Sequence, residues 1–141
     1  MPFFDYSQNN SFGRMVENSS VHSHVIVEAE TADKANERAQ EIGLYFDGCE
    51  SGIDCSCCGD RWYRHVYDDY GDDEPCVYGT PVEKWVEHFR TGRTSAYEGG
   101  VWVYFADGRQ VGYGNTSPST RNFSVRTVRE IWTRRSRSHN D

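Results

Sequence analysis

This chain of 141 residues contains little lysine, no long apolar run and few apolar residues overall. No apolar stretch approaches the roughly 18 residues of a membrane-spanning helix, which excludes proteins anchored by such helices. The start of the sequence, MPFFDYSQNN, has neither a basic stretch nor a long apolar core, so we expect no secretory signal. We therefore expect a cytoplasmic protein without membrane contacts, whose five cysteines stay reduced and do not form a disulfide framework.

The small apolar content limits the core that the chain can form. Hydrophobic residues make up 36% of the chain, and aromatic residues, which each bury a large area, make up 14%. We expect a single domain over residues 1–141, with a polar N-terminal arm at residues 1–20 and a frayed tail at residues 136–141. We also expect a homo-oligomer, because association completes the burial that a small core leaves unfinished.

Charge is divided unevenly along the chain. Residues 1–108 carry eight basic and twenty acidic side chains, whereas residues 109–141 carry seven arginines and two acids. Only Lys34 and Lys84 are lysines, and arginine binds phosphate and carboxylate bidentately and stacks on rings. Two interpretations remain open: a basic end that folds back on the acidic body, or a basic site for an anionic ligand. Long duplex nucleic acid is a poor partner for so acidic a body.

Hydrophobic periodicity alternates between strand and helix patterns. Strand or hairpin patterns occur at residues 24–30, 44–46, 61–67, 101–105 and 109–113. Helix patterns begin at the capping residue Thr31 and end at Ile42, run from Pro81 to Gly92, and begin again near Ser124. Residues 68–75 form an acidic loop without the ligand spacing of a calcium site. This order predicts an α+β fold, with a small, mainly antiparallel sheet and two or three helices packed on one side.

Four of the five cysteines lie within ten residues. Cys55 and Cys58 have the two-residue gap of a zinc-binding pair, and Gly59 follows them as in many zinc knuckles. The side chains that can complete a ligand set are Cys49, His65 and Cys76. We predict no cofactor, with zinc at Cys55, Cys57 and Cys58 as the alternative. A turn with buried thiols, which pack as small hydrophobes, and a redox or nucleophilic role also remain open.

A polar, glycine-bracketed loop precedes the last predicted helix. Exposed N–H groups at a helix N-terminus, the helix dipole and flanking guanidinium groups together suit a phosphate. The residues that we expect to bind such a ligand are Arg61, Trp62, Tyr104, Arg109, Asn115, Thr116, Ser117, Arg121, Phe123 and Arg126. The arginines would hold phosphates, the amide and hydroxyls would form hydrogen bonds, and the rings would stack on a base. An ordinary loop and helix cap is the alternative.

The sequence carries no catalytic signature. It has no Ser-His-Asp order, zinc-protease helix, phosphate-binding loop motif or dinucleotide fingerprint. We therefore predict a protein that is not an enzyme and has no catalytic residues.

The segment GLYFDGCESGIDCSCCGDRWY, preceded by VIVEAETADKANERAQEIG, resembles a family of small proteins encoded by tailed bacteriophages. The likeness covers residues 24–64 well and the later helix and VWVYFADGR hairpin more loosely. The shared pattern comprises Asp54, Cys55, Cys57, Cys58, Gly59, Asp60, Arg61 and Trp62. Cys49 lies outside this pattern, which weakens a four-cysteine zinc site.

The resemblance implies a phage origin and action in the cytoplasm of an infected bacterium, but no reaction. By analogy, small phage proteins such as the Thoeris anti-defence sponges sequester nucleotide-derived immune signals without cleaving them. We therefore expect a phage anti-defence protein that binds a small phosphate-bearing nucleotide. The alternatives are an inhibitor that binds a host protein through the acidic residues 68–74, and a small zinc-binding protein.

Overall fold

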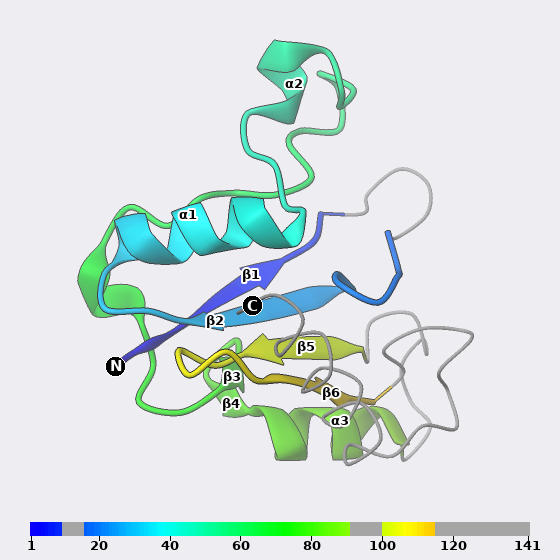
Figure 1. Cartoon of the computed structure of the whole chain (residues 1–141). Helices are drawn as coiled ribbons and strands as arrows, with labels where there is room; N and C mark the ends of the chain where they lie inside the picture. The colour runs from blue at the N-terminus through cyan, green and yellow to red at the C-terminus, as the bar shows by residue number, and fades with distance from the viewer. Residues whose placement is uncertain (10–15, 91–99, 115–141) are drawn as a thin grey trace, which may run out of the picture.

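The computed structural model describes residues 1–9, 16–90 and 100–114 (Figure 1). Its main sheet has four strands in the order β1-β2-β5-β6. These strands are β1 (Phe3–Ser7), β2 (His24–Glu28), β5 (Val101–Tyr104) and β6 (Gln110–Tyr113). The β1–β2 and β5–β6 pairs are antiparallel, and the central β2–β5 pair is parallel. The predicted α+β class with a mainly antiparallel sheet is confirmed.

Helix α1 (Ala32–Ile42) covers one face of this sheet. Thr31 begins it by accepting a hydrogen bond from the N–H of Lys34, and Gly43 ends it at a φ of 130°. The buried residues of the helix are Ala32, Ala35 and Ala39. Their small side chains let the helix approach the large rings of the sheet, among them Phe4, Tyr6, Trp102 and Tyr104. This face carries the larger of the two core clusters.

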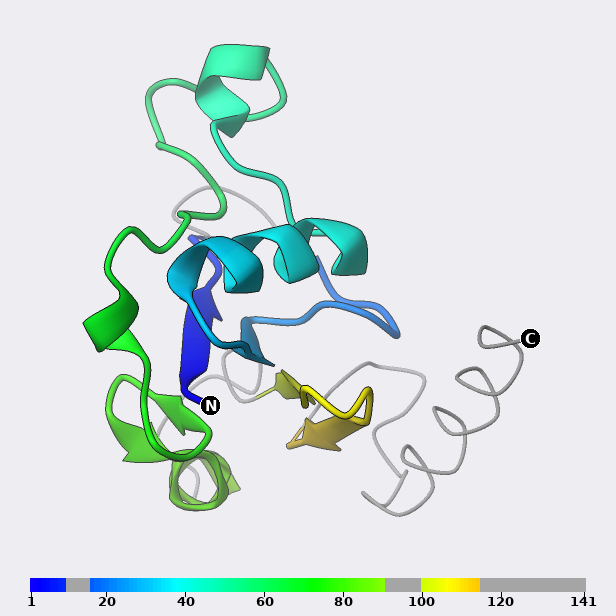
Figure 2. The same ribbon diagram turned by 60° about the vertical axis from the view of Figure 1, so that its left-hand side comes forward.

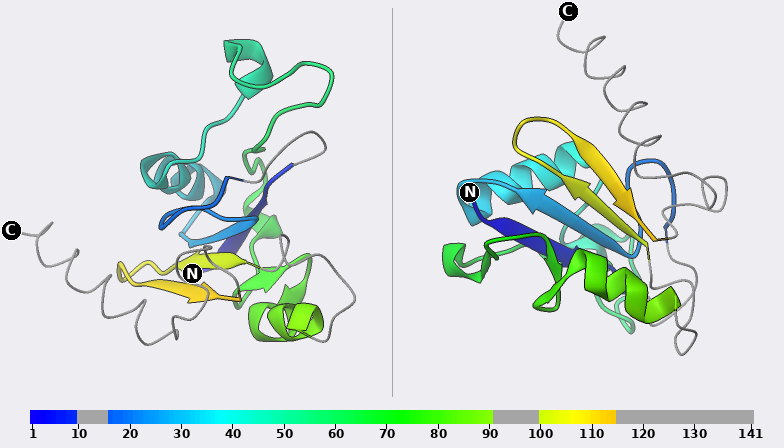
Figure 3. Two further views of the ribbon diagram at one scale, coloured as in Figure 1. Left: turned by 90° about the vertical axis from the view of Figure 1, so that its right-hand side faces the viewer. Right: turned by 90° about the horizontal axis from the view of Figure 1, so that it is seen from below.

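The opposite face is covered by a short hairpin and by α3 (Val82–Arg90). The hairpin strands are β3 (Cys76–Val77) and β4 (Thr80–Pro81). The two long helices thus lie on opposite faces, as Figure 3 shows, whereas one-sided packing was the expectation. The physical reason lies in β2, where Val25, Ile26 and Val27 are consecutive apolar residues that point alternately to the two faces. A strand with apolar residues on both faces must be covered on both.

The expected polar arm at residues 1–20 is wrong for its first residues, which form strand β1. Phe4 and Tyr6 point to the α1 face, and Phe3 points to the α3 face. The strand pairs with β2 in the register Phe3 to Glu28. The polar residues Asp5 and Ser7 made this segment look like a loop in the sequence. The strand is recognisable only from its pairing with β2, which is distant in the sequence.

Residues 61–67, which were predicted to form a strand, join no β-ladder. Instead, the side chain of Asn36 donates to the carbonyl of His65 at 2.8 Å and accepts from its N–H at 3.0 Å. A side chain of α1 thus takes the place of a neighbouring strand. The expected strand at residues 44–46 is likewise not formed, and the helix expected near Ser124 lies outside the described residues.

Two short helices complete the described part of the chain, α2 (Gly48–Ser51) and the 3₁₀ helix η1 (Asp68–Tyr70). None of the helices in the described residues combines the length and the apolar character that crossing a membrane would require.

Candidate metal centre

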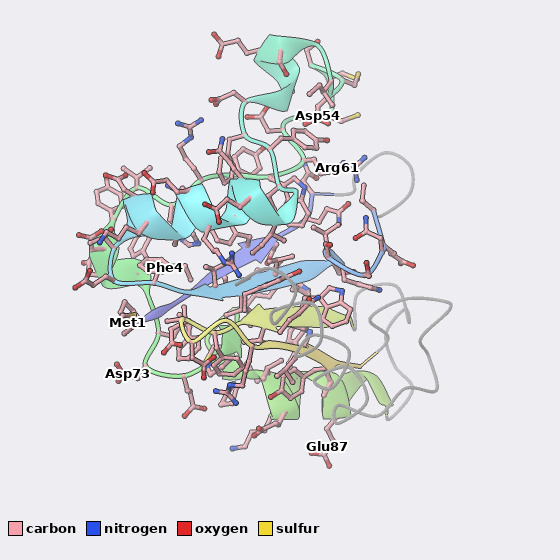
Figure 4. The ribbon with its side chains drawn as sticks, in the orientation of Figure 1. Met1, Phe4, Asp54, Arg61, Asp73 and Glu87 are labelled. Atoms are coloured by element: carbon pink, nitrogen blue, oxygen red, sulfur yellow. The ribbon has the colours of Figure 1, made fainter. Side chains whose placement is uncertain are left out.

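Residues 45–61 form a lobe that projects from the sheet beyond α1 and carries α2 at its tip (Figure 1). The base of the lobe is held by a polar network (Figure 4). The carboxylate of Asp54 accepts from the Tyr45 hydroxyl at 2.7 Å and from the Arg61 N–H at 2.8 Å. The guanidinium of Arg61 donates to the Tyr45 hydroxyl at 3.1 Å and to Gln8 Oε1 at 2.6 Å. Arg61 therefore ties the lobe to the end of β1.

Gly48 is required at the start of α2 by this network. A Cβ at this position would lie 1.9 Å from Asp54 Oδ2 and 2.8 Å from the Tyr45 ring. No side chain fits there unless the carboxylate moves and breaks its hydrogen bonds. The glycine thus permits the close approach that positions Asp54.

The side chains of two further residues, Asp60 and Asn9, fix the segment that carries the cysteines. Asp60 Oδ1 accepts from the N–H of Cys49 at 2.9 Å. The amide of Asn9 donates to the carbonyl of Cys58 at 2.9 Å and to that of Asp60 at 3.2 Å. Most of the motif that runs from Asp54 to Arg61 therefore serves to shape the lobe.

The thiols of Cys55, Cys57 and Cys58 come together on an exposed turn of this lobe. The three sulfur atoms all lie within 4.8 Å of one another. The N–H groups of Cys58 and Gly59 both donate to the carbonyl of Cys55, at 3.1 and 3.2 Å, and Gly59 adopts a φ of 89°. This tight reversal brings the first and last thiols to the same side. Cys55, Cys57 and Cys58 can hold a metal ion.

The thiols influence one another's ionisation. Hydrogen bonds from Cys57 lower the pKa of Cys55. The hydrogen bond to Cys55, with one to Cys58, raises the pKa of Cys57 to about 11. Cys55 is therefore the first of these two thiols to lose its proton, and the negative charge of the Cys55 thiolate opposes the loss of a proton from Cys57. A bound cation reverses that opposition, because it stabilises each added thiolate.

Among the three side chains considered as a fourth ligand, only Cys49 lies beside the cluster. Its thiol donates to the carbonyl of Cys55 at 3.4 Å. His65 instead shares a hydrogen bond of 2.7 Å with the carbonyl of Asp5 and packs against Phe4 and Tyr6. Cys76 is buried in β3, on the opposite face of the sheet from α1. Cys49 is thus the candidate that lies in the lobe, but its sulfur is not among the three that lie within 4.8 Å of one another.

The interpretation of the cluster as a turn with buried thiols is wrong, because none of the four cysteines in the lobe is buried. Cys55 and Cys57 are exposed, Cys49 and Cys58 are half-buried, and Cys76 is the buried thiol among the five. An exposed thiol gains nothing from packing as a hydrophobe.

The residues expected to bind a nucleotide are not brought together in the described part of the chain. Trp62 and Tyr104 belong to the core and are 2% and 5% exposed, so neither ring face is open to a base. Arg61 belongs to the network of the lobe. Arg109 pairs with Asp107 at 2.8 Å and stacks over the Phe105 ring. The remaining expected residues, Asn115, Thr116, Ser117, Arg121, Phe123 and Arg126, lie outside the described residues.

A buried carboxyl group on the α3 face is a feature that the sequence did not reveal. The carboxyl group of Asp5 is largely shielded from solvent, and this burial raises its pKa to about 7. One carboxyl oxygen accepts from the N–H of Tyr78 at 3.2 Å, and the other has no hydrogen-bond partner among the described residues. Beside it, the Ser7 hydroxyl and His24 Nδ1 are 2.9 Å apart. The only sequence signal is the position of Asp5 at an inward site of a strand.

These features define a small α+β protein with a projecting lobe that presents three cysteines. Residues 1–120 match the family described as a domain of unknown function (DUF7296), and the chain belongs to this family. The match includes the whole lobe and ends before Arg121. No curated protein and no solved structure matches the chain.

Proposed function

We propose that this protein binds zinc through Cys55, Cys57 and Cys58, with Cys49 as the fourth ligand. The single observation that carries the proposal is the convergence of three thiols on one exposed turn. Zinc binds thiolates at about 2.3 Å in a tetrahedral arrangement, and four cysteines form a closed site without a position for a substrate. The metal would serve the structure of the lobe, and the protein would not be an enzyme.

A structural role for zinc agrees with the composition of the lobe. Within α2 only Gly48 is buried, and Ile53 at the tip is 65% exposed. A segment that buries so few apolar side chains gains little stability from a core of its own. Metal binding to thiolates supplies folding free energy directly, since the assembled site exists only in the folded lobe.

The zinc proposal predicts about one zinc ion per chain in protein purified under reducing conditions. Replacing Cys57 or Cys58 with Ser should reduce the zinc content towards zero, and Cys49→Ser should weaken affinity while retaining some metal. Cys76→Ala is the matched control, because Cys76 lies away from the lobe, and it should retain the full content. Native mass spectrometry and elemental analysis measure these contents. Wild-type protein without zinc, even after zinc is added, would reject the proposal.

A second candidate function rests on the excess of arginine over lysine at the C-terminal end. In it, the protein is a phage-encoded anti-defence protein that sequesters a nucleotide-derived signal in the host cytoplasm without cleaving it. Arg121 and Arg126 would hold phosphates, residues 115–117 would supply hydrogen bonds, and Phe123 would stack on the base. Slow release requires a ligand that is largely buried, and a homo-oligomer can provide such a site between subunits.

Calorimetry with a cyclic dinucleotide and with ADP-ribose tests this second function. Each of Arg121→Ala and Arg126→Ala should weaken binding by about 1.5–3 kcal/mol, as expected for a lost charged hydrogen bond. Arg38→Ala, on the exposed side of α1, should bind as the wild type does. A sequestered nucleotide should also be recovered intact after heating. Unchanged affinity in both arginine variants would refute the site.

A further inference from the structure

The outer side of residues 63–74 carries aromatic and acidic side chains together. Tyr63, Val66, Tyr67 and Tyr70 are between 57% and 70% exposed, and they are half of the exposed large hydrophobic residues in the described part of the chain. Asp69, Asp73 and Glu74 are exposed beside them along the chain, and none of the three forms an ion pair with a described residue. We call these seven residues the strap surface. Exposed apolar groups gathered in this way commonly mark a contact surface.

The strap surface is held in place from beneath, so its side chains are presented on a fixed backbone. Phe3 and Asp72 exchange two backbone hydrogen bonds of 2.8 Å, and His65 bonds to the carbonyl of Asp5. The rings of Tyr67 and Tyr70 pack edge to face, with their centroids 5.2 Å apart. Figure 2 shows this segment descending from the lobe to the β3–β4 hairpin on the side of the molecule that carries β1. A fixed surface loses less conformational entropy when it binds.

The chemistry of this surface suits guanidinium groups. Carboxylates accept bidentate hydrogen bonds from arginine, and tyrosine faces accept its flat cation, which is less strongly hydrated than an ammonium. The same chain carries six arginines and one acid between residues 121 and 137. We propose that residues 121–137 dock on the strap surface of their own chain. The docking would account for the use of arginine, and not lysine, at the C-terminal end.

The connection is long enough for docking within one chain. The described part of the chain ends at Gly114, after β6, and the strap lies outside β1, where Asp72 pairs with Phe3, four strand spacings from β6. Four spacings amount to about 19 Å, and the seven residues from Gly114 to Arg121 can span about 23 Å. A tethered segment has an effective concentration in the millimolar range, well above that of a second copy at micromolar protein. The occupant is therefore the chain's own segment.

This inference depends on neither zinc binding nor nucleotide binding. It concerns the same arginines as the second candidate function, so a phosphate ligand that bound them would compete with the strap surface. The test below uses no nucleotide, and its outcome is separate from that of the calorimetry.

Photo-cross-linking in the full-length protein tests the docking. A benzophenone amino acid is placed at Tyr67 or Tyr70 and, as a control, at the exposed Ile53 of the lobe. After irradiation at low micromolar protein, peptide mass spectrometry should find links from the strap positions to residues 121–137 within monomers. Asp69→Asn with Asp73→Asn should lower the yield several-fold, and Glu50→Gln in the lobe should leave it unchanged. Salt at 1 M should also lower the yield, because it screens exposed charges beyond about 3 Å.

Three results would overturn the proposal. The first is the absence of links to residues 121–137 from the strap positions. The second is an equal yield from Ile53, which would show unspecific contact. The third is a link found only in covalent dimers, which would assign the surface to a second copy. Replacing the six arginines with lysine separates stacking from charge: docking predicts a lower yield, and an unchanged yield would reject the role of the rings.

Discussion

Asp5→Asn should stabilise the protein by about 2–4 kcal/mol at pH 8. The carboxyl group of Asp5 is largely shielded from solvent, and burial raises its pKa from 3.8 to about 7. A shift of this size corresponds to about 4 kcal/mol of unfavourable free energy when the group is ionised in the folded state. Asparagine keeps an acceptor for the N–H of Tyr78 and removes the buried charge. The amide's own unpaired donors reduce the gain to the stated range.

The pH dependence of this effect has a definite sign. In the unfolded chain Asp5 ionises near pH 4, whereas in the folded protein it stays protonated up to about pH 7. The folded state therefore binds the extra proton between these values, and wild-type stability falls as the pH rises through this window. The stability difference between the variant and the wild type should be small at pH 4, grow up to pH 7 and be constant above it.

Urea unfolding at a series of pH values measures this difference. Subtracting the wild type removes the contributions of other groups, such as His22, whose pKa burial lowers to about 4. Asp72→Asn is the comparison variant, because burial also raises the pKa of Asp72, and the Asp72 charge itself helps to raise the pKa of Asp5. It should show a smaller slope of the same sign. A stability difference between Asp5→Asn and the wild type that does not vary with pH would show that folding does not raise the pKa of Asp5.

Local signals in the sequence correctly predicted the elements that depend on local contacts. The hydroxyl of Thr31, the alanine spacing and Gly43 define α1, and the structure confirms each of them. The Asp107-Gly108 pair predicted the β5–β6 hairpin, which forms with Gly108 at a φ of 98°. Each of these features involves neighbours within a few residues, so the sequence alone contains their partners.

The features that the sequence did not reveal depend on distant partners. Strand β1 is defined by its pairing with β2, and residues 61–67 lack a β-ladder because the side chain of Asn36 bonds to the backbone of His65 instead. The consecutive apolar residues Val25, Ile26 and Val27 indicate that both faces of β2 are covered, but they do not show that α3 covers the second face. Periodicity shows that a residue is inward, but not which element lies over it.

The candidate metal centre was predictable in part. The spacing of Cys55 and Cys58 pointed to a shared turn, and Gly59 has the left-handed conformation that closes it. The position of Cys49 beside the turn was not predictable, because it depends on the return of the chain after α2. Trp62 and Tyr104 were predicted to stack on a ligand, but both lie in the core. The sequence cannot distinguish an aromatic residue of the core from one that stacks on a ligand, because both use the same residue types.

Trp62→Ala should lower the free energy of unfolding by about 3–5 kcal/mol, the usual cost of removing a buried tryptophan side chain. Trp62 is 2% exposed and packs in the cluster with Phe4, Ala35 and Tyr104. It is the first residue after the lobe whose ring enters this core. The loss therefore combines a cavity beneath α1 with loss of the anchor between the lobe and the sheet.

Ile53→Ala is the control for this change, since Ile53 lies in the lobe, outside the strap surface, and is 65% exposed. Its cost should remain within about 0.5 kcal/mol, as for most surface substitutions. Urea unfolding followed by far-UV circular dichroism, at a fixed zinc concentration, measures both variants without relying on tryptophan fluorescence. Equal small effects in the two variants would contradict the core position of Trp62. If Trp62→Ala alone also lost affinity for a nucleotide, the Trp62 ring would have to be assigned to ligand binding, against its burial in this structure.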